Sequence, residues 1–362
     1  MVEVAYEQIL SLTPYAGGKS KIAGADKVVK LSSNENAFGT NPNVVAACAQ
    51  KLNDMFRYPD GGCTALRQAI ADANGLDAGR IVCGAGSDEL IGLLCQAYLR
   101  ENDEVVVTQY AFLMYRLYAL TRGAVVREVP EKDFKIDINE ILNAVTAKTK
   151  IVFIANPGNP TGTYLNKNEV RRLCEKLPQN VLLVLDNAYA EFVVKEDYDA
   201  GVGAVDAFEN VVMLRTFSKI YGLGGLRLGW SYSSREIADV LNRVRGPFNV
   251  NAMAQHAGIA AVGDAAFVEK CRMHNKKWQD ALPEKLKAIG LDCVPTVANF
   301  ILVRFPQTNG KTADAANEAL LRKGVIVRAM HAYKLPDCLR ITIGTDDDMT
   351  TVLTVLTEFM RA

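Results

Sequence analysis

The amino-acid sequence predicts an α/β protein with a mainly parallel central sheet sandwiched by helices, a smaller α+β C-terminal domain and an N-terminal arm. The first observation is that short, continuously apolar stretches alternate with helical patterns between residues 80 and 220, which is typical of parallel strands covered on both faces. The second is that this alternation stops near residue 246, after which helical patterns mix with short strands. The third is the length of 362 residues, which suits two domains.

These patterns divide the chain into three segments. We expect an arm over residues 1–28 that packs with the small domain or with a partner, a large domain over 29–246 and a small domain over 247–362. Strands of the large domain are predicted in "RIVCG", "DEVVVTQ", "AVVREVP", "TKIVFIA", "NVLLVLD" and "NVVMLRT", with helices between them, the first from about Asp88 to Leu99. In the small domain, the helical pattern "VEKCRMHNKKWQDALPEKLKAIG" precedes strands in "NFILVRF", "VIVRAM" and "LRITIG".

The composition is that of an ordinary globular protein without an excess of either charge. Basic and acidic residues number 41 each, so we expect neither a nucleic-acid nor a membrane partner. Eight cysteines without a C-x-x-C pair and three histidines without metal spacing predict buried thiols and no metal site. The sequence shows no secretory signal pattern and no apolar run near the roughly 18 residues of a membrane span, so we expect a cytoplasmic protein.

Polar residues stand directly after several predicted strands. In an open α/β sheet the ligand site forms beyond the carboxyl ends of the strands, so these residues are the candidates for a functional site. They are Gly86, Ser87 and Asp88, then Asn159, then Asp186 with Tyr189, and finally Ser218 with Lys219. Because they follow four separate strands, we expect them to face one crevice.

Asp186 and Lys219 are the two charged members of this set, and each has a plain structural explanation when taken alone. Asp186 follows "VLLVL" directly, where an unpaired buried charge would be costly, and it could serve as a helix cap or in a salt bridge. Lys219 follows another apolar strand and could extend to the surface. A partly buried lysine, however, tends to lose its proton and becomes a nucleophilic amine able to form a Schiff base.

Taken together, the candidates supply what pyridoxal phosphate requires of a protein. That cofactor needs an amine for its aldehyde, an anion beside its pyridine nitrogen, donors to its ring hydroxyl, and a cationic, amide-rich cradle for its phosphate. Lys219 can supply the amine and Asp186 the anion, and Asn159 and Tyr189 can donate to the ring hydroxyl. The phosphate cradle can be formed by Gly86, Ser87, Asp88, Ser218 and Arg227.

The motifs "NPGNPTG", "DNAY", "SK" and "GLRLGW" resemble, in order and spacing, those of the fold-type I pyridoxal-phosphate aminotransferases. This resemblance covers nearly the whole chain and implies that fold. It implies catalytic roles for Lys219 (Schiff base), Asp186 (pyridinium partner) and Tyr189, which with Asn159 donates to the ring hydroxyl, and a phosphate clamp of Ser218 and Arg227. Two positions depart from the common form: Asn187 replaces a glutamate, and "NPGNP" lacks a frequent second asparagine. Neither position carries the chemistry.

The "GAGSDEL" turn is expected to present backbone N–H groups to the phosphate at a helix N-terminus. A dinucleotide-binding fingerprint is the alternative, and it is rejected because the third glycine and the matching acidic residue are missing. An aromatic ring usually stacks on the pyridine ring of the cofactor in this family. We expect Phe112 in that place, with Tyr110 as the second candidate.

Further motifs, "LTPY", "LSSNEN", "RYPDGG", "GVIVR" and "LRITIGT", resemble the histidinol-phosphate aminotransferase branch of the family. In that branch the tyrosine matching Tyr58 reaches the cofactor phosphate of a partner subunit, which implies a homodimer with shared active sites. The resemblance also implies substrate contacts from Tyr15, Asn36, Arg328 and Arg340. The planar fork of donors on each arginine suits phosphate and carboxylate alike.

The resemblance implies ping-pong transamination of L-histidinol phosphate with 2-oxoglutarate, giving imidazole-acetol phosphate and glutamate, with Lys219 moving the α-proton. Transamination of phenylalanine and tyrosine, alone or as a second specificity, is the main alternative, and decarboxylation of threonine phosphate is a lesser one. A transcription regulator that senses the cofactor would need a basic DNA-binding module, which the sequence does not show. A non-catalytic scaffold is disfavoured because every cofactor-contacting position is occupied.

Overall fold

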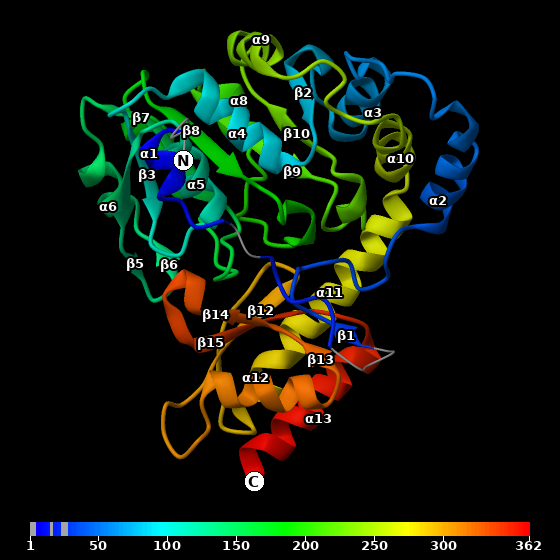
Figure 1. Cartoon of the computed structure of the whole chain (residues 1–362), viewed down its shortest axis with the longest axis vertical. Helices are drawn as coiled ribbons and strands as arrows, with labels where there is room; N and C mark the ends of the chain where they lie inside the picture. Colours follow the sequence, from blue (N-terminus) through cyan, green and yellow to red (C-terminus); the bar gives the residue numbers. More distant parts are fainter. Residues whose placement is uncertain (1–4, 15–16, 23–27) are drawn as a thin grey trace.

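The structure is a computed structural model that describes residues 5–14, 17–22 and 28–362. Its centre is a seven-stranded sheet (Figure 1) with the strand order β2 (Ile81–Gly84), β10 (Gly229–Tyr232), β9 (Val211–Thr216), β8 (Leu182–Asp186), β7 (Thr149–Ala155), β3 (Glu104–Thr108) and β4 (Val125–Val129). Strand β10 runs antiparallel to both of its neighbours, and the other pairs are parallel. The prediction of a mainly parallel sheet is confirmed, and β10 is the strand that the apolar pattern did not reveal.

Helices cover both faces of this sheet. They are α2 (Pro42–Ala49), α3 (Thr64–Asn74), α4 (Ser87–Tyr98), α5 (Leu113–Thr121), α6 (Ile138–Ala144), α7 (Lys167–Lys176), α8 (Val202–Ala207), α9 (Arg235–Val244) and α10 (Ala252–Val262). Alternate residues of β8 enter two different cores, with Leu183 and Leu185 on one face and Leu182 and Val184 on the other. A strand with two buried faces must be apolar at every position, which is why these strands appear in the sequence as unbroken apolar stretches.

A second layer forms the small domain (Figure 1). Its antiparallel sheet has the order β11 (Asp292–Val294), β12 (Phe300–Arg304), β15 (Leu335–Thr342) and β14 (Arg328–Met330), and it packs with α11 (Ala265–Lys287), α12 (Ala313–Arg322) and α13 (Asp346–Arg361). The short strand β1 (Val29–Lys30) pairs in parallel with β13 (Val325–Ile326). The first residues after the arm are therefore part of the small domain.

Helix α10 packs against the large domain, although the sequence places the domain boundary before it, at residue 246. Ala254, Ala257 and Ala261 are buried in the core of the large sheet, and a Cβ on Gly258 would lie 2.6 Å from Leu228 and 2.7 Å from Leu66. The large domain therefore extends through α10, past residue 246. The sequence pattern does not show this because the alternation with strands ends before the large domain does.

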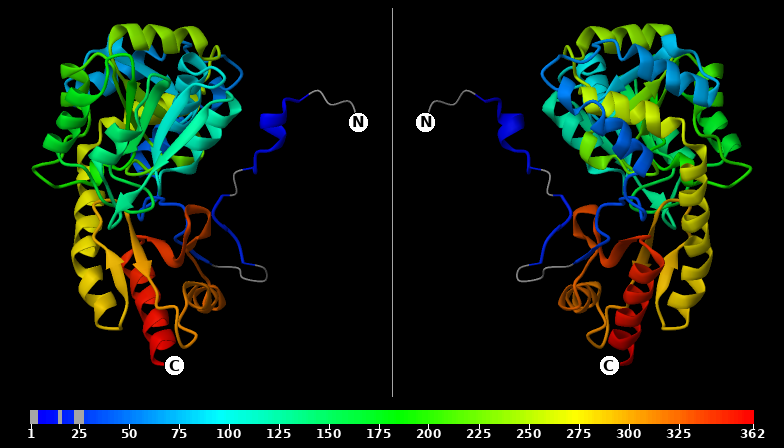
Figure 2. Two further views of the ribbon diagram at one scale, coloured as in Figure 1. Left: turned by 90° about the vertical axis from the view of Figure 1, so that its left-hand side faces the viewer. Right: turned by 90° about the vertical axis from the view of Figure 1, so that its right-hand side faces the viewer.

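The remaining elements are short. They are α1 (Glu7–Leu10), the hairpin of β5 (Glu131–Lys132) and β6 (Lys135–Ile136), and 3-10 turns at Leu52–Asp54, Ala78–Arg80, Ala190–Phe192, Gly224–Leu226 and His331–Tyr333. Helix α1 lies beside α5 and buries none of its residues, and Figure 2 shows the described part of the arm on the outside of the molecule. No helix in residues 5–14, 17–22 and 28–362 is long and apolar enough to cross a bilayer.

Candidate active site

A cavity of about 380 Å³ lies where the carboxyl ends of β7, β8 and β9 face strands β14 and β15 of the small domain. This is the position expected for a ligand site in an open α/β sheet. The predicted residues that line it are Ser87, Asp88, Phe112, Asn159, Asp186, Tyr189, Ser218, Lys219, Arg227, Arg328 and Arg340. Residues from both domains thus surround one space, and their chemical roles stay predictions.

Asp186 lies at the end of β8 with only 6% of its surface exposed. Its Oδ2 accepts a 2.7 Å hydrogen bond from the Tyr115 hydroxyl, and its Oδ1 accepts one from the backbone N–H of Ala188. Burial raises the pKa of Asp186 to about 6, although these two hydrogen bonds by themselves would lower it. A buried carboxylate of this kind favours a cation placed beside it, because the cation stabilises the ionised form.

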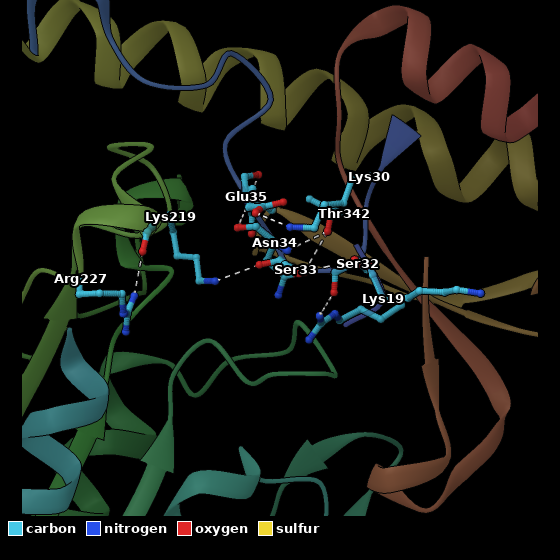
Figure 3. A network of polar contacts seen from close by, with 12 residues as sticks. Lys19, Lys30, Ser32, Ser33, Asn34, Glu35, Lys219, Arg227 and Thr342 are labelled. Carbon is cyan, nitrogen blue, oxygen red and sulfur yellow. Dashed lines mark hydrogen bonds and ion pairs between the residues drawn. The ribbon is translucent and has the colours of Figure 1, made fainter. Parts of the chain in front are cut away.

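The amine of Lys219 extends into the cavity toward the segment formed by residues 32–35 (Figure 3), and its Nζ donates to the Ser33 carbonyl at 3.2 Å. Burial, followed by the nearby positive charge of Arg340, lowers the pKa of Lys219 to about 8. The neutral, nucleophilic amine is therefore far more abundant near neutral pH than on an ordinary lysine.

Tyr189 forms the wall next to this amine, with the Lys219 Nζ 5.8 Å from its ring centroid. Its hydroxyl accepts a 2.9 Å hydrogen bond from the Asn34 side chain, and burial raises the pKa of Tyr189 to about 12. The phenol therefore stays protonated and can donate to an oxygen in the cavity. Asn34 and Tyr115 both line the cavity, and sequence reasoning missed both.

At the opposite end of the cavity, donors converge at the N-terminus of α4. Arg227 donates from Nη1 to the Ser218 Oγ at 3.3 Å and to the Gly224 carbonyl at 3.0 Å. Gly86 has φ +85°, and a Cβ there would lie 2.4 Å from the Arg227 Nη2, so glycine is required for the guanidinium to approach. A helix N-terminus beside an arginine and a hydroxyl suits a phosphate dianion.

Asp88 lies in the first turn of α4 and also lines the cavity. Its Oδ2 accepts a 2.9 Å hydrogen bond from the Tyr118 hydroxyl. A Cβ on Gly92, one turn along α4, would lie 3.0 Å from the Tyr118 ring, so the helix carries a glycine where that ring packs.

The small-domain wall of the cavity carries two arginines. Arg340 donates from Nη1 to the Asn159 Oδ1 at 2.6 Å and from Nη2 to the Ser32 carbonyl at 2.8 Å. Arg328 stands opposite Arg340 in the ladder of β14 and β15. Two guanidinium groups on adjacent strands provide the cationic surface that the anionic end of a substrate needs.

Four of the other predicted residues do not line this cavity, namely Gly86, which adjoins Arg227, and Asn36, Tyr110 and Tyr58. The structure contradicts the placement of Asn36 against the substrate: its Nδ2 donates to the Ile220 carbonyl at 2.6 Å, and its Oδ1 accepts from Phe38 N. Tyr110 packs its ring on Phe134 at 5.7 Å, so Phe112 is the aromatic candidate at the cavity. Tyr58 is 84% exposed. Tyr15 lies outside the described residues.

Asn187, the departure from the family pattern, points away from the cavity. It is fully buried, and its Nδ2 donates to the Asn156 carbonyl at 2.8 Å and to the Tyr198 hydroxyl at 3.0 Å. The residue thus supports the loop after β7.

The donor set fits pyridoxal phosphate. A buried carboxylate, a lysine amine of lowered pKa, a protonated tyrosine and a glycine-lined phosphate cradle surround one cavity, and these are the groups that this cofactor requires. Within the described ranges, no group of three or more His, Cys, Asp and Glu side chains is arranged to hold a metal ion.

Comparison with known proteins agrees with this geometry. Residues 26–356 match the family model of class I and II aminotransferases. The chain is 52% identical over 354 residues to the histidinol-phosphate aminotransferase of Paramagnetospirillum magneticum and 49% identical over 354 residues to that of Maricaulis maris, covering 98% of each chain in both comparisons. The histidinol-phosphate aminotransferase structure from Sinorhizobium meliloti, in complex with pyridoxal-5'-phosphate, superposes with a TM-score of 0.91 at 27% identity, covering 100% of this chain and 98% of that one. The chain belongs to the class I and II aminotransferases.

Proposed function

We propose that the protein catalyses the pyridoxal-phosphate-dependent transamination of L-histidinol phosphate with 2-oxoglutarate, giving imidazole-acetol phosphate and glutamate in a ping-pong reaction. The observation that carries this proposal is that Lys219, Asp186 and the arginine pair of the small domain surround one cavity. Support comes from relatives about half identical over nearly their whole length, which carry the name histidinol-phosphate aminotransferase.

Each residue has a definite task in this reaction. The bound cofactor supplies an electron sink for the carbanion formed at the substrate α-carbon. Lys219 would hold the cofactor aldehyde, and its amine, with a pKa of about 8, would take the α-proton of the substrate and deliver it to the carbon that bore that aldehyde. Asp186 would keep the ring nitrogen protonated, and Tyr189 would donate to the ring hydroxyl.

Arg328 and Arg340 are assigned to the anionic end of the substrate. One pair of guanidinium groups can hold the phosphate ester in the first half-reaction and a carboxylate of 2-oxoglutarate in the second. Asn159, which is bonded to Arg340, links this wall to the residues around the cofactor ring.

Substrate choice is tested by following the visible absorption of the holoenzyme during titration with L-histidinol phosphate and, separately, with L-phenylalanine. We expect histidinol phosphate to convert the cofactor to its amine form at a concentration at least about tenfold lower, because its phosphate gains a charge-assisted arginine contact. Equal or better conversion by phenylalanine would assign the arginines to a carboxylate and make the protein an aromatic aminotransferase.

The protein is further proposed to act as a homodimer in which Tyr58 reaches the cofactor phosphate of the partner. Tyr58 stacks on Phe248, and both rings are exposed on this chain, as are Met55 and Phe56 nearby in sequence. Exposed apolar residues of this size mark an interaction surface. The cytoplasm is the proposed compartment, since all eight cysteines are free thiols, as expected under reducing conditions.

Removing only the hydroxyl, with Tyr58→Phe, tests this arrangement. We expect sedimentation equilibrium to give a dimer for the wild type and the variant, and the dissociation constant of pyridoxal phosphate to rise about fivefold in the variant, the worth of one hydrogen bond. Tyr6→Phe, at another exposed tyrosine, is the matched control and should change neither. A monomeric wild type, or unchanged cofactor affinity in Tyr58→Phe, would contradict the proposal.

A further inference from the structure

The β5–β6 hairpin (residues 131–136) is an element that the sequence did not predict and that lies close to the cofactor-ring end of the cavity. Its two central residues, Asp133 and Phe134, have φ angles of +51° and +62°. Positive φ is unfavourable for a bulky residue such as phenylalanine. Strain of this kind persists where the surrounding contacts fix the conformation, and it is frequent near functional sites.

On one side the hairpin holds the turn that leads to Phe112. The Oε1 of Glu131 accepts a hydrogen bond from Tyr110 N at 3.2 Å, and Glu131 N donates to the Gln109 Oε1 at 3.3 Å. Burial raises the pKa of Glu131 to about 7, although hydrogen bonds from the Thr108 side chain and from Tyr110 N lower it. Glu131 therefore connects the hairpin to the turn that leads to Phe112 through both its side chain and its backbone.

On the other side the hairpin holds the loop that carries Asn159. The Phe134 carbonyl accepts a 2.7 Å hydrogen bond from the Thr163 hydroxyl. Thr163 shares a hydrogen bond with Thr161, and its carbonyl accepts from Gly158 N at 2.8 Å. The loop on both sides of Asn159 is therefore connected to the tip of the hairpin.

The same tip also contacts the small domain. Phe134, Tyr110 and Leu113 pack against a buried cluster of the small domain. The members of that cluster are Val294, Leu302, Met330, Tyr333, Leu335 and Cys338. Met330 belongs to β14, the strand that begins with Arg328. One short hairpin thus touches the Phe112 turn, the Asn159 loop and the domain that carries the substrate arginines.

We propose that the β5–β6 hairpin is a positioning element, in which Glu131 and Phe134 hold Phe112 and Asn159 in register with each other and with the small-domain arginines. It acts through Phe112 and Asn159 and does not itself touch the cofactor. This inference rests on the proposed function, because it assumes that pyridoxal phosphate occupies the cavity between those two residues.

The test compares Glu131→Ala with Glu131→Gln in the full-length protein, measuring the dissociation constant of pyridoxal phosphate by its visible absorption band and the melting temperature of the apoprotein. Glutamine keeps the acceptor for Tyr110 N and is neutral, as the buried acid is when protonated. We expect Glu131→Ala to weaken cofactor binding about fivefold, the worth of one hydrogen bond, and Glu131→Gln to stay within about twofold of the wild type. Lys132→Ala, an exposed residue of the same hairpin, is the control and should match the wild type.

Thr163→Val tests the other connection and replaces Glu131→Ala if that variant does not fold. It is also expected to weaken cofactor binding about fivefold and to lower kcat for amino transfer while leaving KM nearly unchanged. The inference is overturned if the variants lower the apoprotein melting temperature while cofactor affinity stays that of the wild type, or if the glutamine and alanine variants lose affinity equally. A wild-type protein that binds no pyridoxal phosphate would instead refute the proposed function.

Discussion

Replacing Lys219 by alanine is expected to abolish transamination while the protein stays folded. The rate should fall by at least about four orders of magnitude, because the variant lacks both the amine that holds the cofactor and the base that moves the α-proton. The measurement is the single-turnover conversion of the bound cofactor by L-histidinol phosphate, followed by absorption.

The melting temperature of Lys219→Ala shows whether the loss of activity comes from the missing amine or from unfolding. The pKa of Lys219 is lowered from 10.5 to about 8 in the folded protein, so below pH 8 the unfolded state holds this proton more tightly than the native state. The lysine therefore destabilises the apoprotein at neutral pH, and this cost is relieved as the pH rises from about 8 to 10.5. The variant should melt no lower than the wild type at pH 7. Lys148→Ala, at an exposed lysine, is the control with full activity, and transamination that persists in Lys219→Ala would rule out the assignment.

The second large effect is expected from Asp186→Asn, which keeps the shape of the side chain and removes its charge. Without an anion beside it, the pyridine nitrogen no longer stays protonated, so kcat should fall about 10²- to 10³-fold, the usual worth of a buried electrostatic contact to the reacting system. Cofactor should still bind, because Lys219 and the phosphate donors are unchanged. Asp239→Asn, at an exposed carboxylate, is the matched control.

The pH dependence of apoprotein stability provides an independent readout of this variant. The pKa of Asp186 is raised from 3.8 to about 6, so between these values the native state keeps a proton that the unfolded state has released. Stability from this group therefore falls as pH rises from about 4 to 6, by on the order of 3 kcal/mol. Denaturant unfolding at several pH values should show a smaller fall in Asp186→Asn. An unchanged pH profile together with wild-type kcat would contradict the role given to this carboxylate.

The site residues at the strand ends could be predicted because the direction of each strand alone places them at the carboxyl edge of the sheet. Asp186 ends β8, and Ser218 and Lys219 come shortly after β9. Parallel strands bring their carboxyl ends to one edge of the sheet. Polar side chains at these strand ends can therefore reach the crevice, as Asp186, Ser218 and Lys219 do.

Contacts between segments that are far apart in the chain could not be predicted from the sequence. The hydrogen bond from Asn34 to Tyr189 spans 155 positions, and φ of +54° at Asn34 turns the chain, so Asn34 and not Asn36 meets the cavity. Tyr115 has the pattern of a core helix residue, and only the packing of α5 on the sheet brings its hydroxyl to Asp186.

The sequence by itself determined every strand of the large sheet except β10 and the main side chains at its carboxyl edge, because local apolar patterns and parallel topology specify them. The tertiary structure decided the attachment of α10 to the large domain, the side-chain partners of Asp186 and Tyr189, and the place of the β5–β6 hairpin between two loops of the site. These depend on backbone turns at positive φ and on contacts between residues far apart in the chain, where the free energy comes from packing that no local pattern encodes.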